Sequence, residues 1–378
     1  MRLQGLVARG FRNLADLDRD LPAAGVAILG ANGQGKTNLL EALYYPVLFR
    51  SFRGATDADV GGFGGPGFHV EVRAADRVVT ATYSAGPRRK RIAIGGEEIR
   101  RVARAIGSCL AVAFLPVDVG LAGGPAAERR RYLDRVLSLA DPRYLTALGR
   151  YRAALAQRNG ALRQGRPNLA RAFDRVLSDA GAVVTERRLA WTAGAAARFP
   201  AELACLGERE QVSIGYRGCA DLADPAAWAP ALAAAEPRDG ARGATTVGPQ
   251  RDDLVLEVGG RPLRDVGSTG QQRTAAIALK LLEADTLARA HGTEPALLLD
   301  DVFAELDRER QERLARRLGL GGERQVFVTA PRRDELPPGM ELELWSISAG
   351  TVSGRSGSSR VAADGATSAG MAARSVVE

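Results

Sequence analysis

The sequence predicts an α/β fold whose two halves come from opposite ends of the chain. Three observations indicate this fold. A glycine-rich loop, GANGQGKT at 30 to 37, stands between a short apolar segment and an amphipathic one. A second apolar segment, at 296 to 299, runs directly into the paired residues Asp300 and Asp301. Between these two motifs lies a long stretch whose apolar residues recur at helical spacing.

The glycine-rich loop has the pattern of a phosphate-binding loop, G-x-x-x-x-G-K-[ST]. The apolar residues before it read as a buried strand, and those after it recur at helical spacing. Glycines let consecutive backbone N–H groups point at phosphate oxygens, and a helix N-terminus adds partial positive charge. The alternative, a purely structural glycine turn, explains neither flank. The predicted nucleotide-binding residues are Gly30, Ala31, Asn32, Gly33, Gln34, Gly35, Lys36 and Thr37.

The rarity of lysine singles out Lys36. Lysine occurs only at positions 36, 90 and 280, and every other basic residue is arginine. Because the two cations are not equivalent, a retained lysine indicates a position that needs an ammonium group. We expect Lys36 to contact the β- and γ-phosphates during catalysis and Thr37 to ligate Mg²⁺.

The paired aspartates fit the same chemistry. A nucleotide–metal site needs a carboxylate delivered from the end of a buried strand, and a cation there offsets the repulsion between two adjacent carboxylates. We expect Asp300 to hold Mg²⁺ and Asp301 to orient or deprotonate the attacking water. The alternative, that both aspartates merely cap the next helix, is weaker because both follow an apolar run.

A third motif, VGSTGQQR at 266 to 273, opens a predicted helix. Ser268 is a suitable N-cap residue, and a capped helix start beside glycine forms a second anion site. The same chain already has a phosphate loop, so this second site is expected to serve a nucleotide bound by a second protomer.

Composition limits the possible partners and the cellular location of the chain. The formal net charge of +8 and the isoelectric point near 9.8 are compatible with a polyanionic partner without requiring one. No apolar run is long enough to cross a membrane, and no N-terminal secretory signal is present. Three widely spaced cysteines fit neither a disulfide framework nor a metal site, which favours a reduced, cytoplasmic setting.

Taken together, these motifs resemble those of the ABC-type ATPases of chromosome maintenance, and most closely the RecF family of bacterial recombinational repair proteins. The resemblance covers about residues 1 to 330 in the family order. It rests on these stretches: FRNL at 11 to 14, GANGQGKTNLLEAL at 30 to 43, PAAERRRYLDRVLS at 125 to 138, QRNGALR at 157 to 163, GPQRDDL at 248 to 254, GQQRTAAIALKLLEA at 270 to 284, and PALLLDDVFAELDRERQERL at 295 to 314.

The resemblance implies a P-loop ATPase head assembled from residues 1–105 and 236–350, with a mainly α-helical arm at 106–235 inserted between them. It identifies Ser268, Gly270 and Gln271 as a signature motif acting in trans, and Asp307 as the D-loop aspartate. The last segment, 351–378, is rich in glycine, serine and alanine and is expected to be a disordered tail.

Several positions depart from the family's usual residues. Gln250 stands where histidine is usual, Ala304 stands where serine is usual, and Thr269 varies the centre of the signature. No histidine follows the paired aspartates, and the next apolar strand ends in Thr329 instead. ABC transporter subunits carry a histidine after the paired acidic residues, so its absence argues against this class of protein.

The resemblance also implies a function. ATP would join two heads into a dimer that clamps DNA at single-strand gaps or junctions and helps RecO and RecR to load RecA. Slow, weakly DNA-stimulated ATP hydrolysis would open the clamp. Two alternatives stay open: a structural DNA tether like SMC proteins, and a nuclease-coupled ATPase.

The DNA-contacting residues are left unassigned. Arg129, Arg130 and Arg131 lie on a predicted helix, where at most two of the three side chains can face one partner. A second basic run, RRKR at 88 to 91, falls in a predicted hairpin turn. A solvated helix face with internal salt bridges is an equally good account of any single arginine.

Overall fold

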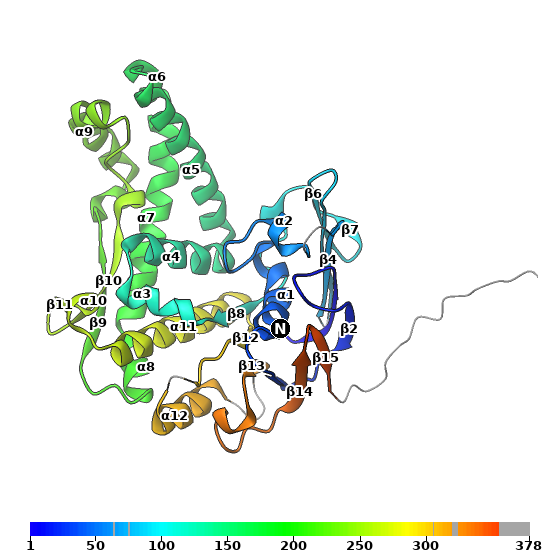
Figure 1. Ribbon diagram of the computed structural model, residues 1–378. Coiled ribbons are helices and arrows are strands. Elements are labelled where there is room, and N and C mark those ends of the chain that lie inside the picture. The colour runs from blue at the N-terminus through cyan, green and yellow to red at the C-terminus, as the bar shows by residue number, and fades with distance from the viewer. Residues whose placement is uncertain (63–64, 75, 305, 320–323, 355–378) are drawn as a thin grey trace, which may run out of the picture.

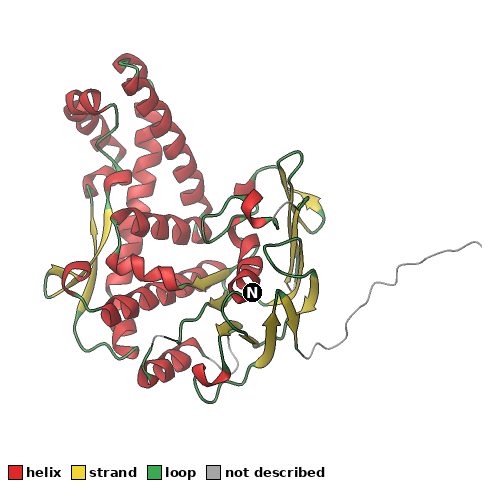
Figure 2. Cartoon of the chain, viewed as in Figure 1, coloured by secondary structure: helices red, strands yellow, loops and turns green. Residues whose placement is uncertain are grey.

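The computed structural model describes residues 1–62, 65–74, 76–304, 306–319 and 324–354. It contains three β-sheets and two groups of helices (Figures 1 and 2). Two of the sheets lie near the N-terminus, and the third, at the left of the view, lies beside the base of a helical projection (Figure 1).

The central sheet has the strand order β15-β14-β3-β13-β12-β8. All its pairings are parallel except that of β15 with β14. Strands β8, β12 and β13 are buried along their whole length, as expected for parallel strands covered on both faces. The strands are β3 (Gly25–Leu29), β8 (Ala111–Phe114), β12 (Ala296–Leu299), β13 (Val326–Ala330), β14 (Glu343–Ser348) and β15 (Thr351–Ser353).

The second sheet is antiparallel, with the strand order β2-β1-β4-β5-β6-β7. Buried and half-buried residues alternate along β4 and β5, so one face of this sheet packs on the core. Six strands form this sheet. They are β1 (Leu3–Arg9), β2 (Leu17–Asp20), β4 (Gly67–Ala74), β5 (Val78–Ser84), β6 (Arg89–Ile94) and β7 (Glu97–Glu98).

Helices form the projecting arm. Helices α5 and α7 pack side by side and project from the rest of the chain, with α6 at their far end (Figure 1). The helices of this region are α3 (Gly120–Gly123), α4 (Ala126–Ala140), α5 (Pro142–Arg163), α6 (Pro167–Arg171), α7 (Asp174–Ala196), α8 (Phe199–Cys205) and α9 (Trp228–Arg242).

The remaining helices belong to the head and its connections. They are α1 (Lys36–Leu48), α2 (Asp57–Val60), α10 (Leu263–Val266), α11 (Thr269–His291) and α12 (Arg308–Leu318). Six short 3₁₀ helices of the described chain are η1 (Val102–Arg104), η2 (Pro116–Val119), η3 (Ala220–Ala223), η4 (Pro225–Ala227), η5 (Pro249–Arg251) and η6 (Arg333–Glu335).

The structure moves three of the predicted boundaries. Strand β8 belongs to the central sheet although it lies within 106–235, so the arm begins after it rather than at residue 106. Helix α9 runs across the predicted boundary at 235. Residues 351–353 form β15 in the central sheet rather than part of the tail. The rest of the predicted tail, 355–378, lies outside the described residues.

A third sheet was not predicted. It has the order β11-β10-β9, with β9 (Val212–Arg217), β10 (Asp253–Val258) and β11 (Arg261–Pro262). Strand β9 comes from the predicted arm and β10 from the predicted C-terminal part of the head, and the two pair antiparallel along six residues each. This pairing ties the arm to the segment that leads into α11.

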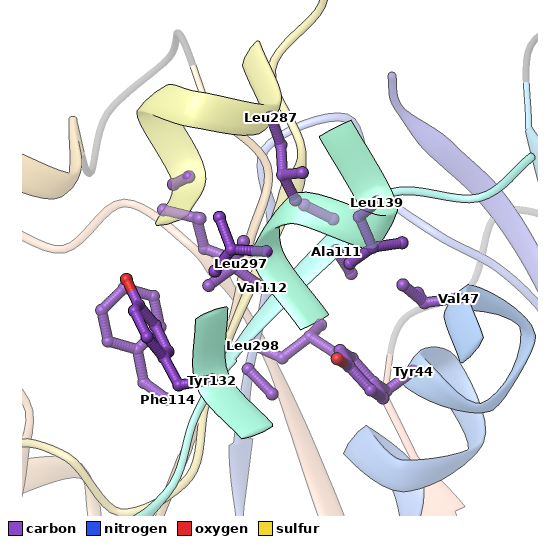
Figure 3. Packing of buried hydrophobic residues seen from close by; sticks show 14 of the residues in the cluster. Tyr44, Val47, Ala111, Val112, Phe114, Tyr132, Leu139, Leu287, Leu297 and Leu298 are labelled. Carbon is purple, nitrogen blue, oxygen red and sulfur yellow. The ribbon is translucent and has the colours of Figure 1, made fainter. Parts of the chain in front are cut away.

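One large hydrophobic core joins these layers. Figure 3 shows its centre, where Tyr44 and Val47 of α1, three residues of β8, and Leu297 and Leu298 of β12 meet Tyr132 and Leu139 of α4 and Leu287 of α11. Residues from both ends of the chain therefore share one interior. Among the described residues, no helix is both long and apolar enough to span a membrane.

Candidate nucleotide site

The phosphate loop lies where the sequence predicted it, between β3 and α1. Gly33 and Gly35 have φ angles of 81° and 113°, in the left-handed region that favours glycine. A Cβ atom at Gly35 would lie 3.0 Å from Oδ1 of Asn13, so a larger residue would also have to shift that side chain by a few tenths of an ångström. The local sequence thus specifies the curled backbone that a phosphate site needs.

The Lys36 side chain is almost fully buried inside this loop. Its ammonium donates hydrogen bonds to the carbonyl oxygens of Gly30 at 2.7 Å and Ala31 at 3.4 Å. These contacts hold the positive charge against the loop, and Lys36 lines a cavity of about 310 Å³. The cavity is lined by Asn32, Gly33, Gly35, Lys36, Thr37, Asn38, Arg53 and Asp301.

The two distant motifs meet at Thr37 and Asp300. Asp300 follows the last residue of β12, and its carboxylate accepts a hydrogen bond from the Thr37 hydroxyl at 2.9 Å. The hydroxyl of Thr329, from the neighbouring strand β13, lies 3.0 Å from the same oxygen atom. Burial raises the pKa of Asp300, the two threonine hydrogen bonds lower it, and the nearby Asp301 carboxylate raises it.

The Asp301 carboxylate lies beside the same Thr329 hydroxyl as Asp300 does. The backbone of Asp301 has an uncommon conformation. Its φ angle is 49°, a left-handed conformation that is uncommon for residues other than glycine. The Thr329 hydroxyl accepts from the backbone N–H of Asp301 at 2.9 Å and lies 3.1 Å from its carboxylate. Thr329 thus fixes both aspartates, and the polar end of an otherwise apolar strand was the sequence signal for it.

The oxygens of Thr37 and Asp300 suit a magnesium ion. Hydroxyl and carboxylate oxygens are the ligands that Mg²⁺ prefers, usually only one or two of them from protein beside phosphates and water. Asp300 is only 5% exposed, and its burial disfavours a bare negative charge. A divalent cation on these two oxygens would offset that cost.

The predicted signature residues lie at the start of α11 and face solvent or are half-buried. Ser268 accepts from the backbone N–H of Gln271 at 3.2 Å, and the Gln271 side chain accepts from the N–H of Ser268 at 2.9 Å. Gly270 lies beside Arg310 of α12. Among the described residues, none of these three lines the cavity at the phosphate loop, so within one chain they serve as a helix cap.

Asp307 is the N-cap residue of α12, and its carboxylate accepts from the N–H of Arg310 at 2.8 Å. This capping role accounts for its position within one chain. The neighbouring Glu305 lies outside the described residues.

A second cavity of about 260 Å³ adjoins the first one, and Asn32 and Asp301 line both. It lies between the ends of β8 and β12 and the helix α11. Its charged lining residues include Asp118, Arg273 and Lys280, none of which the sequence analysis placed at the site. The rarity of lysine was the available signal for Lys280, as it was for Lys36.

Lys280 belongs to a buried ion cluster that joins α11 to the arm. Its ammonium lies 2.6 Å from the Glu283 carboxylate, which also accepts two hydrogen bonds from Arg135 of α4, at 3.0 and 2.9 Å. Burial lowers the pKa of Lys280 and the charge of Arg135 lowers it further, while Glu283 raises it. The cluster ties the signature helix to the base of the arm.

Two residues of the FRNL motif lie at the back of the phosphate loop. Arg12 makes a two-bond ion pair with the buried Glu41 of α1, at 2.9 Å for each bond. Asn13 donates to the carbonyl of Gly33 at 3.3 Å and accepts from Asn38 at 2.6 Å. Arg12 is therefore occupied by α1, whereas Asn13 contacts the loop itself.

The predicted basic runs are largely engaged within the chain. Arg129 makes a two-bond ion pair with Asp253, at 2.8 and 2.9 Å, and Arg130 donates to the carbonyl of Asp252 at 2.7 Å. Arg131 remains 71% exposed along its side chain, and its guanidinium lies 3.9 Å from the Glu128 carboxylate.

The second basic run lies mostly in a strand. Residues 89–91 belong to β6, and only Arg88 lies in the preceding turn. Lys90 pairs with Asp57 at 2.8 Å and donates to the carbonyl of Phe49 at 2.7 Å. The ammonium of Lys90 is therefore committed inside the head, while Arg88 and Arg91 are exposed.

Known proteins resemble the chain over almost its whole length. It is 34% identical over 369 residues to the DNA replication and repair protein RecF of Herpetosiphon aurantiacus, covering 89% of this chain and 95% of that protein. It is 37% identical over 375 residues to the RecF protein of Chloroflexus aggregans, covering 87% and 93%. No family model matches the chain.

Solved structures show the same relationship. The structure of the recombination mediator protein RecF-ATP in the RecFOR pathway superimposes with a TM-score of 0.85 at 28% identity, over 94% of this chain and 98% of that one. An Smc head domain from Pyrococcus furiosus, solved with an extended coiled coil and part of ScpA, superimposes with a TM-score of 0.54 at 16% identity, over 94% and 96%. The second likeness concerns the fold alone.

Proposed function

Because the chain belongs to the RecF family of DNA replication and repair proteins, we propose that it is an ATP-dependent DNA clamp of recombinational repair. ATP joins two heads into a dimer around DNA at a single-strand gap or junction, and hydrolysis releases them. The observation that carries the proposal is the contact of Thr37 with Asp300, which assembles one nucleotide site from both ends of the chain.

ATP binding uses the cavity at the phosphate loop. Backbone N–H groups of the loop point at phosphate oxygens, and the Lys36 ammonium moves from the loop carbonyls to the β- and γ-phosphates. Arg53, which lines the same cavity, adds a second cation. Thr37 and Asp300 would hold Mg²⁺, which would supply positive charge to the β- and γ-phosphates.

Hydrolysis uses Asp301. Its carboxylate lies on the wall of the phosphate cavity, where it orients a water molecule or accepts its proton. The water oxygen forms a bond to the γ-phosphorus while the bond to the β–γ bridging oxygen breaks, which yields ADP and phosphate. A slow rate suits a timed switch, because the clamp must persist long enough for partner proteins to arrive.

The signature residues act in the other protomer. Ser268, Gly270 and Gln271 lie at an accessible helix start, where backbone N–H groups and the helix dipole favour an anion. In the dimer this helix start contacts the γ-phosphate bound by the partner head, and Asp307 lies nearby in the D-loop. Two nucleotides are thus enclosed, and loss of the γ-phosphate removes the bridge.

The DNA-bound dimer acts with RecO and RecR to load RecA. The first test is the molar mass of the protein without nucleotide, with MgATP and with MgADP, each with and without gapped DNA. A dimer that forms only with MgATP and retains DNA best in that state supports the clamp. A mass that does not respond to nucleotide contradicts it, and a nucleotide-dependent dimer without affinity for RecR would instead indicate an SMC-like tether.

A further inference from the structure

We propose that the turn between β14 and β15 holds the phosphate loop in its ATP-binding shape, and that Gln34 and Gly350 are positioning residues for ATP. The inference deepens the proposed function and rests on it, because it concerns the same nucleotide site. The contact joins the apex of the loop to a hairpin near the opposite end of the chain.

The turn grips the loop at its apex. The backbone N–H of Ala349 donates to the side-chain oxygen of Gln34 at 2.6 Å, and the N–H of Gly350 donates to the backbone carbonyl of Gln34 at 2.9 Å. The Gln34 side chain thus faces the hairpin, whereas its neighbours Gly33 and Gly35 line the phosphate cavity. Gln34 therefore serves the nucleotide through the hairpin.

Strand β14 also packs against both ends of the loop. It runs parallel to β3 with Ser346 opposite Leu29, so it continues past the point where β3 enters the loop. A Cβ atom at Gly30 would lie 2.4 Å from the carbonyl oxygen of Ile347, and one at Gly35 would lie 3.1 Å from its Cδ1 atom. The first and last glycines of the loop are thus fitted to the same residue of β14.

The turn itself is held in a restricted conformation. Ala349 and Gly350 have φ angles of 47° and 79°, as a tight two-residue hairpin turn requires. The Gly350 carbonyl accepts from the N–H of Ala15 at 3.0 Å. A Cβ atom at Gly350 would lie 1.8 Å from the carbonyl oxygen of Asn13, so any larger residue must displace the turn. The turn therefore contacts the phosphate loop on one side and residues 13–15 on the other.

This arrangement predicts a specific kinetic effect. A phosphate loop binds well when its N–H groups already point at the phosphates, because no ordering cost then falls on binding. Releasing the apex from the hairpin raises that cost and weakens ATP binding. The chemical step depends on Lys36, Asp300 and Asp301, which the hairpin turn does not contact. Loss of the contact between the hairpin turn and Gln34 should therefore raise KM and leave kcat nearly unchanged.

The test compares Gln34→Ala and Gly350→Ala in the full chain with a matched glycine control. Gly339 has the same φ angle as Gly350, 79°, but a Cβ atom there meets nothing within 4 Å. Gly339→Ala thus reproduces the backbone cost without the contact. We expect KM and the calorimetric Kd for MgATP to rise about three- to tenfold in Gln34→Ala and in Gly350→Ala, the effect of about one hydrogen bond. The Gly339→Ala protein should match the wild type.

A double variant makes the test sharper. If Gln34 and Gly350 act through one contact, the Kd of the Gln34→Ala/Gly350→Ala protein for MgATP should not exceed the larger of the two single-variant Kd values. If the two residues act independently, the two increases in Kd should multiply. An unchanged KM in Gln34→Ala, or an equal loss in kcat, overturns the inference; the Gln34→Ala result decides alone if Gly350→Ala does not fold. Wild-type protein that fails to bind MgATP would instead contradict the proposed function.

Discussion

The Thr37 hydroxyl donates a hydrogen bond to the Asp300 carboxylate over 2.9 Å, although the two residues lie 263 positions apart in the chain. Each residue is presented by its own buried strand, β3 for the loop and β12 for the carboxylate, with β13 between them. The order of strands in the central sheet therefore brings the site residues together. Single substitutions can test the role of each of these residues.

Replacement of Asp301 by Asn should trap the dimer. Asparagine keeps the size and an oxygen that the Thr329 hydroxyl can reach, but it cannot accept a proton from water. We expect ATP hydrolysis to fall by roughly 10²- to 10⁴-fold, the usual contribution of a positioned general base. Light scattering with MgATP should still show a dimer.

Lys36→Met provides the contrast to Asp301→Asn. It removes the cation proposed to contact the phosphates, so we expect to detect neither ATP binding nor the dimer. Hydrolysis at the wild-type rate by Asp301→Asn would show that another group activates the water.

Replacement of Asp300 by Asn should stabilise the nucleotide-free protein at neutral pH. Burial raises the pKa of Asp300 in the folded state, so the folded state holds this proton more tightly than the unfolded state does. Stability therefore falls as pH rises from the ordinary carboxyl pKa through the raised one. Asparagine removes this loss while keeping an acceptor for Thr37.

The measurement is the melting temperature with and without MgATP at several pH values. The advantage of Asp300→Asn should be present at pH 7, shrink toward pH 4, and be accompanied by loss of the stabilisation by MgATP. A melting temperature below that of the wild type at pH 7 without nucleotide would contradict the burial argument.

Replacement of Thr329 by Val should disturb both aspartates at once. Valine keeps the shape of threonine but leaves the N–H of Asp301 without its acceptor. We expect a loss of about 1 kcal/mol in the free energy of unfolding, the low end of the cost of an unsatisfied buried group because this N–H is only partly buried, together with slower hydrolysis. Urea unfolding and steady-state ATPase assays measure the two effects. Thr329→Ser retains the hydroxyl and should recover most of both.

Replacement of Ser268 by Ala should separate the helix cap from the role in trans. Loss of an N-cap costs about 1 kcal/mol, and Thr56→Ala removes a comparable capping box from α2, away from the signature. Both variants should therefore lose similar stability. Only Ser268→Ala should weaken the MgATP-dependent dimer, measured as the protein concentration at half-assembly. An equal effect of both variants would leave the Ser268 side chain with a capping role only.

The arginines at 129 and 131 should behave in opposite ways. Arg129→Ala leaves the partly buried Asp253 without its ion-pair partner. The free energy of unfolding should fall by about 3–5 kcal/mol, the usual penalty for breaking a buried pair. Arg131→Ala should leave the melting temperature unchanged. If Arg131 contacts a DNA phosphate, its loss reduces the dependence of log Kd on log salt by about one. An unchanged salt dependence would remove Arg131 from the DNA-binding surface.

The parts of the fold that the sequence predicted are those with local signals. The phosphate loop and the strand before Asp300 each combine a short apolar run with residues whose chemistry is distinctive. Strand β8 lacks such a marker, because a four-residue apolar run reads equally well as part of a buried helix. It was therefore assigned to the arm.

The contacts that sequence reasoning missed are the long-range ones. The bond between Ala349 and Gln34 joins residues 315 positions apart, and the pair of Arg129 with Asp253 joins residues 124 positions apart. Nothing in either local segment specifies its partner. Strand β9 was missed for the same reason, since its partner β10 lies beyond the whole of α9.

The order of strands in the central sheet has a consequence for biosynthesis. Strand β3 and its loop emerge early from the ribosome, but β12, β13, β14 and β15 are all made after residue 295. The nascent chain therefore carries an apolar strand and a bare phosphate loop for most of its synthesis, without the carboxylates or the hairpin that complete the site. A nucleotide site that has all of these residues therefore exists only in a chain that is translated through residue 353, and shorter chains should bind ATP more weakly.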